Sequence, residues 1–225
     1  MNIIKGLIKK DLYNLVSYKT SILIIVIFIC VLSIFSSGMI NYIPIIICTI
    51  IGMIALSTFS YDEMAKSDKF ILSIPTNRRE IIKAKYILSI GATILGGILG
   101  IVITIIMANI INYVRPENAI NINYDSLISY TIGGMFGISL IQAIQIPSIY
   151  KWGAEKGRIQ MFILLFILVA AVSGVVYLIV KSNINVELLK SFIDRFGLFI
   201  LISFIVIMYF ASFKIACRIY EKQEN

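Results

Sequence analysis

The chain has 225 residues, of which 59% are hydrophobic and only 14% are charged, and its mean hydropathy is +0.95. A soluble domain carries about 25% charged residues, so this composition excludes an ordinary soluble protein and predicts an integral membrane protein. The absence of histidine removes the usual general base and the commonest metal ligand. We assign the net charge of +8 to topology and contact with anionic lipid rather than to nucleic-acid binding.

Residues 1–19 are predicted to form an amphipathic helix that lies in the headgroup plane of the membrane. Their apolar residues recur at helical spacing, with Lys5, Lys9, Lys10 and Asn14 between them. The simpler alternative is a cytoplasmic extension of the first span. The apolar positions are Ile3, Ile4, Leu7, Ile8, Leu12, Leu15 and Val16.

Six apolar segments follow, each long enough for a helix that crosses about 30 Å of hydrocarbon. Helices are expected because every backbone amide must be satisfied within its own segment. The first segment is too long for a removable signal peptide and lacks its cleavage site. A tight hairpin near Ile40-Asn41 is predicted to join the first two. The predicted spans are about 20–39, 42–60, 86–113, 127–150, 159–180 and 196–213.

Lysine and arginine positions predict the orientation of these spans. Sixteen of the twenty precede the first span, follow the last, or lie between spans two and three or four and five. Both termini and residues 61–85 are therefore predicted to be cytoplasmic. The four on the other side are Arg115, Lys181, Lys190 and Arg195.

No acidic or basic residue lies within a predicted span, which argues against a secondary transporter because such proteins usually bury charges on their pathway. Gln142 and Gln145 share a helix face; they either line a translocation pathway or hydrogen-bond between helices. Pro147 is expected to kink or end that helix. No catalytic or metal-binding constellation is predicted. The expected close-packing glycines are the GxxxG pairs Gly96 and Gly100, and Gly133 and Gly137.

The segment 61–85, YDEMAKSDKFILSIPTNRREIIKAK, has ten charged side chains, whereas residues 20–60 have none. Proline disfavours helix for the residue before it, so Pro75 is predicted to separate a short helix from a second one. Asn77 is predicted to cap the second helix, with Glu80 as its reciprocal partner. We expect a helix–break–helix just beneath the membrane; the alternative is a charged loop that only enforces topology.

At this segment the chain resembles the membrane subunits of type-2 ATP-binding-cassette (ABC) exporters. Residues 59–87 are similar to one bacterial branch, in which an aspartate-glutamate pair precedes a leucine- or isoleucine-proline step, an arginine and a lysine-tyrosine. Asn77 departs from the serine or threonine that is usual there. The architecture of the whole chain fits the family. The matching positions are Asp62, Glu63, Ile74, Pro75, Arg78, Lys85 and Tyr86.

The resemblance implies that residues 61–72 form a coupling helix that docks on a cytoplasmic ATPase. The chain has no GxxxxGK[ST] phosphate loop, so ATP and Mg²⁺ are expected on a separate ATPase subunit, and no cofactor on this chain. A second permease, identical or different, would supply the other half of the pathway in a bacterial plasma membrane. The expected ATPase-coupling residues are Tyr61, Asp62, Glu63, Met64, Lys69, Phe70, Pro75 and Arg78.

The whole chain is thus predicted to be one all-α permease domain that exports an amphipathic or hydrophobic substrate, such as an antimicrobial peptide, toxin, lipid or drug. Two other functions stay open. One is a secondary transporter, because sodium can be held by carbonyl groups alone. The other is a membrane immunity protein with no transport cycle.

Overall fold

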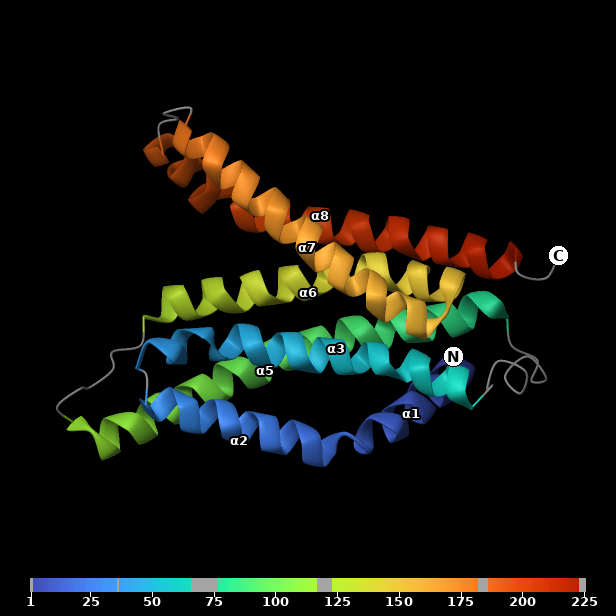
Figure 1. Ribbon diagram of the computed structural model, residues 1–225, viewed down its shortest axis with the longest axis horizontal. Coiled ribbons are helices and arrows are strands. Elements are labelled where there is room, and N and C mark those ends of the chain that lie inside the picture. The colour runs from blue at the N-terminus through green and yellow to red at the C-terminus, as the bar shows by residue number, and fades with distance from the viewer. Residues whose placement is uncertain (1, 36, 66–76, 117–122, 182–185, 223–225) are drawn as a thin grey trace. The chain divides into compact units, whose positions relative to one another are not determined.

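The computed structural model describes residues 2–35, 37–65, 77–116, 123–181 and 186–222, and these are helical apart from short connections (Figure 1). No strand occurs among these residues, which confirms the all-α prediction. Two compact units divide the chain, residues 1–142 and 143–225, so that α6 belongs to both. The helices are α1 (Asn2–Val16), α2 (Lys19–Phe35), the 3-10 helix η1 (Ser37–Tyr42), α3 (Ile43–Met64), α5 (Arg78–Val114), α6 (Tyr124–Trp152), α7 (Ala154–Lys181) and α8 (Val186–Lys222).

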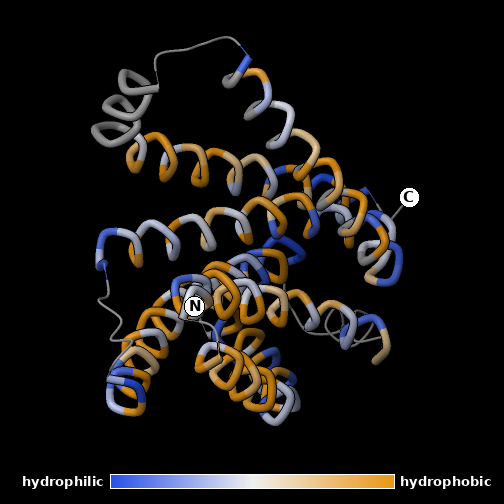
Figure 2. The backbone as a smooth tube through the Cα atoms, turned by 60° about the vertical axis from the view of Figure 1, so that its left-hand side comes forward, coloured by the Kyte–Doolittle hydropathy of each residue, from blue (hydrophilic) through white to orange (hydrophobic). Residues whose placement is uncertain are grey.

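Within the described residues, four helical stretches are long and apolar enough to cross a membrane: Gly38–Met64, Arg78–Val114, Tyr124–Trp152 and Gly197–Lys222. A fifth results if α1 and α2, bent by 59° at residues 17–18, are taken as one broken span. Hydrophobic residues run along most of each long helix, and hydrophilic residues gather toward the helix ends (Figure 2). Several membrane spans are therefore supported, while the count of six stays a prediction.

Several helices extend beyond the predicted spans. The 3-10 turn of η1 makes the expected hairpin between α2 and α3, and Pro44 fits the first turn of α3, where a missing N–H costs no hydrogen bond. Residues 61–64 are the last turn of α3 and not the start of a separate helix, which corrects that expectation. Asn77 does precede α5, but its side chain makes no capping bond; its backbone carbonyl accepts from Glu80 N–H at 2.8 Å.

Glycines allow α3 to approach α5 and α6 closely within the first unit. A methyl group on Gly100 would stand 2.7 Å from the Pro44 Cα, and one on Gly96 3.0 Å from the Cys48 Cα. This confirms the first predicted GxxxG pair. The second pair makes no such approach among the described residues, because a methyl group on Gly133 or Gly137 would meet nothing within 4 Å. A methyl group on Gly134 would instead stand 3.0 Å from the Ile45 Cα. A nearby buried cluster comprises Ile29, Ile40, Ile43, Ile47, Met107, Ala108 and Ile111.

In the second unit, α6 continues through Pro147 to Trp152, so the proline does not end the helix. Proline has no N–H to give the carbonyl four residues earlier, which here belongs to Ala143. The Ser212 hydroxyl of α8 donates a short hydrogen bond to that carbonyl. Serine side chains of neighbouring helices commonly satisfy backbone groups that proline frees within membranes. This contact therefore joins α6 to α8 where α6 lacks one backbone hydrogen bond.

A single residue, Gly153, turns the chain from α6 into α7. Its φ of 88° is left-handed, a conformation that glycine adopts without steric cost. Its N–H donates to the Ile149 carbonyl at 2.8 Å, and the Gly157 N–H donates to the Gly153 carbonyl at 3.0 Å. A β-carbon at Gly157 would lie 2.7 Å from Ile149 Cγ1. The predicted loop between spans four and five is therefore a sharp helix–helix turn.

Candidate functional site

The described part of the predicted coupling segment begins on the last turn of α3. The Tyr61 ring packs edge-on against Tyr18, with ring centroids 5.9 Å apart. Glu63 and Met64 are exposed, Met64 at 82%. Arg78 is half-buried in the first turn of α5. The predicted residues Lys69, Phe70 and Pro75 lie outside the described residues, as do all positions from 66 to 76.

Asp62, which is predicted to contact the ATPase, is partly buried and lies between two lysines. Its Oδ1 lies 2.5 Å from Lys10 Nζ and its Oδ2 lies 2.5 Å from Lys85 Nζ. Lys85 Nζ also pairs with Asp11 Oδ2 at 2.9 Å, and Lys10 Nζ lies 3.4 Å from Asp11 Oδ1. We call these four residues the ion-pair cluster. It joins three helices: α1 through residues 10 and 11, α3 through residue 62, and α5 through residue 85.

The local sequence explains why these charges point inward. Asp11 falls on the α1 face that carries Ile4, Ile8 and Leu15, because residues three or four apart share a helix face, and α1 packs with this face on α3 and α5. Lys85 lies in a stretch of α5 whose neighbours Ala84 and Tyr86 are also buried.

The Lys85 ammonium group has further partners on α3. Its Nζ donates to the Thr58 hydroxyl at 3.1 Å and stands 4.9 Å from the Phe59 ring centroid. A lysine over an aromatic face gains electrostatic attraction from the ring. One side chain of α5 is thus held by one residue of α1 and three of α3.

The electrostatics of the ion-pair cluster are balanced. Asp11 is 1% exposed and Lys85 is 4% exposed, and a charge so deeply buried is tolerated only when it is paired. The two ammonium groups and two carboxylates cancel. For Lys10, which lies on α1 outside the long spans, burial acts to lower the pKa. The hydrogen bond to Asp62 and the negative charges of Asp11 and Asp62 outweigh that effect and raise the pKa of Lys10 above its ordinary value.

Sequence reasoning found only part of this site. Lys85 was noted as a cytoplasmic cation and a motif position, and Asp62 as a docking residue, but their pairing was not foreseen. Asp11 was missed, although a signal exists: it is the only acidic residue among the first 61, and it falls on an apolar helix face. A lone acidic residue there predicts a buried cationic partner.

Gln142 of α6 hydrogen-bonds to two other helices of the first unit. It is fully buried; its Nε2 donates to the Gly52 carbonyl of α3 at 3.0 Å, and the Thr93 hydroxyl of α5 lies 3.2 Å from its Oε1. A methyl group on Gly52 would lie 2.4 Å from Ile138 Cγ1 and 3.2 Å from Gln142 Nε2, so a glycine here lets α6 lie close to α3. These bonds are the interhelical alternative considered above, and a pathway role stays a prediction.

Gln145, one turn further along α6, is also buried, and its Oε1 has no hydrogen-bond partner among the described residues. The thiol of Cys48 donates weakly to the Thr93 carbonyl at 3.5 Å. In the part of the chain that the structure describes, no three or more potential metal ligands come together.

Residues 6–221 match the family described as "ABC-2 family transporter protein". The match covers nearly the whole chain. The chain belongs to the ABC-2 family of transporter proteins. No curated protein and no solved structure matches it at a significant level.

Membership makes this chain the membrane component of a transporter, with no catalytic activity expected of the component itself, and it implies association with an ABC ATPase. From the sequence, residues 61–85 are predicted to meet this ATPase, and that stays a prediction. The ion-pair cluster lies at both ends of this segment, at Asp62 and Lys85.

Proposed function

We propose that the chain is the permease subunit of an ABC exporter. It forms half of a translocation pathway with a second permease, identical or different, and a separate cytoplasmic ATPase that binds ATP and Mg²⁺ drives it. The cargo is amphipathic or hydrophobic, in keeping with the uncharged interior of the predicted spans. The observation that carries the proposal is the ion-pair cluster, which fixes both ends of segment 61–85 to each other and to α1.

The cluster gives the ATPase a rigid attachment to the membrane helices. A loop joined to two spans only by its backbone would change its own conformation when it is displaced, and the spans would not move. Here Lys85 binds Asp62 directly, so the two ends of the segment move together, and Asp11 makes α1 move with them. A push on segment 61–85 is thereby transmitted to three helices at once. In this proposal Asp62 holds the cluster, while exposed residues meet the ATPase.

Docking is tested by changing the exposed residue Glu63. Glu63→Lys is expected to lower the affinity for the partner ATPase by at least about tenfold, because reversing a charge at an interface places like charges together. Glu155→Lys is the matched control, since Glu155 is exposed at the start of α7 and predicted to face the same side. The measurements are pull-down with the ATPase and its ATP turnover in nanodiscs. Equal binding by wild type and Glu63→Lys would remove Glu63 from the docking surface.

The same preparation separates the exporter from the alternative functions. Transport of cargo that needs ATP and proceeds without an ion gradient supports the exporter. Transport that follows a sodium or proton gradient in the absence of the ATPase would identify a secondary transporter. Protection of cells with no ATP-dependent transport would identify an immunity protein.

Orientation is tested by single cysteines in a chain freed of its native ones. Both termini are proposed to be cytoplasmic, because lysine and arginine accumulate on that side. A cysteine replacing Lys5 or Lys156 should be shielded in intact cells, whereas one replacing Lys190 should react with an impermeant maleimide. Labelling at position 5 in sealed cells would reverse the topology.

A further inference from the structure

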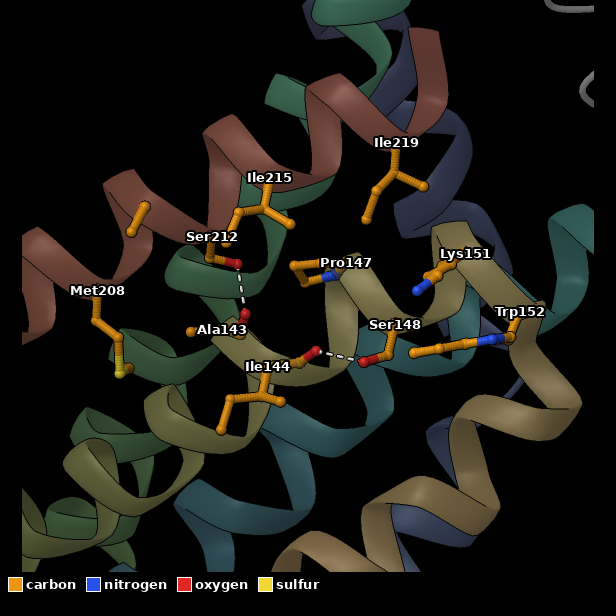
Figure 3. A pocket seen from close by; sticks show the side chains of 11 residues that line it. Ala143, Ile144, Pro147, Ser148, Lys151, Trp152, Met208, Ser212, Ile215 and Ile219 are labelled. Atoms are coloured by element: carbon orange, nitrogen blue, oxygen red, sulfur yellow. Dashed lines mark hydrogen bonds between the residues drawn. The ribbon is translucent and has the colours of Figure 1, made fainter. Parts of the chain in front are cut away.

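A groove of about 400 Å³ lies between the C-terminal half of α6 and α8, entirely within the second unit. Lys151 and Trp152 stand at one end of it and Met208 at the other (Figure 3). Its volume falls within the range of about 300–1,000 Å³ that is typical of ligand sites. Much of its wall is hydrocarbon, contributed by Ile144, Pro147, Met208, Ala211, Ile215 and Ile219.

Both hydroxyl groups in the wall already donate hydrogen bonds to backbone carbonyls of α6. Ser148 Oγ donates to the Ile144 carbonyl at 2.8 Å, and Ser212 Oγ donates to the Ala143 carbonyl. Pro147 adds no N–H. An occupant of the groove therefore meets hydrocarbon along most of its length, and polar groups such as peptide amides would lose hydrogen bonds there.

Positive charge gathers at the Trp152 end. Lys151 Nζ lies 4.3 Å from the centre of the Trp152 ring, and both side chains are exposed. Lys222 also belongs to this end, since it follows Ile219 by three residues and Ile215 by seven along α8 and so shares their helix face. Tryptophan is enriched at the level of lipid headgroups, so this is the end expected at the membrane surface.

We propose that this groove binds one anionic phospholipid, with an acyl chain between α6 and α8 and the phosphate between Lys151 and Lys222. The shape and chemistry of the site match the two parts of such a lipid: an apolar channel and a cationic, tryptophan-bearing mouth. Basic pockets between membrane helices bind anionic headgroups in this way. A zwitterionic lipid would carry a positive group into the same lysines, and a free phosphate would leave the channel unfilled.

Trp152 provides the test, because it is the only tryptophan of the chain. The full-length protein is reconstituted in phosphatidylcholine bilayers that contain a minor fraction of phosphatidylglycerol, with bromine on the acyl chains of one lipid or the other. Brominated phosphatidylglycerol should quench Trp152 fluorescence well beyond its mole fraction. A lysine at the surface favours an anionic lipid by about fivefold, so the relative association constant should fall about fivefold in Lys151→Gln and in Lys222→Gln.

Matched variants separate this site from general effects of charge and bulk. Lys156→Gln removes an exposed lysine near the start of α7 and should leave the preference unchanged. Ala211→Phe fills the channel from an exposed position and should reduce quenching by both brominated lipids, whereas Ala171→Phe, on an exposed face of α7, should not.

Three results would overturn the proposal. Equal quenching by the two lipids at equal mole fraction would show ordinary contact with acyl chains and no selection of headgroup. Quenching by neither lipid would show that protein, such as a second copy of the chain, covers the groove. Unchanged preference in both lysine variants would place the anionic site elsewhere.

Discussion

Lys85→Met is the sharpest test of the ion-pair cluster. Methionine keeps the length of the apolar part of the lysine side chain but removes the ammonium group that binds Asp11, Asp62 and Thr58. Asp11, 1% exposed, is then left with Lys10 at 3.4 Å. Removing one partner of a buried ion pair costs about 3–5 kcal/mol of stability because the remaining charge is uncompensated. We therefore expect the free energy of unfolding to fall by about that amount.

The double variant Asp11→Leu/Lys85→Met distinguishes pairing from packing. It removes both charges of the most buried pair and leaves Asp62 with Lys10. Replacing a buried ion pair by apolar residues is often close to neutral, so the double variant should be more stable than either single variant. Lys83→Met is the control, because Lys83 is exposed two residues earlier on α5 and its replacement should change stability by no more than about 0.5 kcal/mol.

The assay is reversible unfolding of the purified protein in mixed micelles of rising SDS fraction, followed by far-UV circular dichroism. ATP turnover with the partner ATPase is measured on the same variants in nanodiscs. In the proposed function, Lys85→Met keeps ATPase binding but weakens the coupling of turnover to transport. A loss below about 1 kcal/mol in Lys85→Met, or additive losses in the double variant, would refute the reasoning from the cluster.

Two further predictions concern helix packing. Gly100→Ala should destabilise the protein by about 1–3 kcal/mol through overpacking, because the added methyl would stand 2.7 Å from a backbone atom of α3. In the control Gly133→Ala the added methyl meets nothing within 4 Å, so this variant should be neutral or stabilising by up to about 1 kcal/mol. Equal losses of stability in the two variants would contradict the close approach at Gly100. Ser212→Ala should lower the free energy of unfolding by about 0.6–2 kcal/mol, because it leaves the carbonyl four residues before Pro147 without a donor. In a Pro147→Ala background the same change should cost nearly nothing, because the restored N–H can donate to that carbonyl. The same unfolding assay measures both, and an equal loss in the two backgrounds would show that Ser212 stabilises the protein in another way.

The sequence by itself determined the class of the protein and most of its helices. Continuous apolar runs with almost no charge leave a helix as the form that satisfies the backbone in lipid, so an all-α membrane protein follows from composition. The sequence also indicated the hairpin before α3, the start of α5 after Asn77 and the small-residue helix face at Gly96 and Gly100. Each of these patterns is set by residues near one another in the chain. The resemblance at residues 59–87 indicated the transporter family, which the match over residues 6–221 then established.

Tertiary structure alone decided which residues meet across helices. Asp11 and Lys85 are far apart in the sequence. Periodicity assigns each to a face of its helix but does not say which other helix packs against that face. Charge patterning predicted Asp62 as a docking residue but did not indicate its partners, whereas the packing of α1 on α3 and α5 places it between Lys10 and Lys85.

The same reason explains the other corrections. Local rules predicted that Pro147 would kink or end its helix, because proline removes a backbone donor. The structure contradicts only the end, since α6 continues to Trp152 and Ser212, from a helix that is remote in sequence, donates to the freed carbonyl. Likewise, GxxxG spacing marks a face that can pack closely but does not say which glycine faces another backbone, and the structure selects Gly134 over Gly133. Helix formation is a local property of the chain, while partner choice depends on how the finished helices fit together.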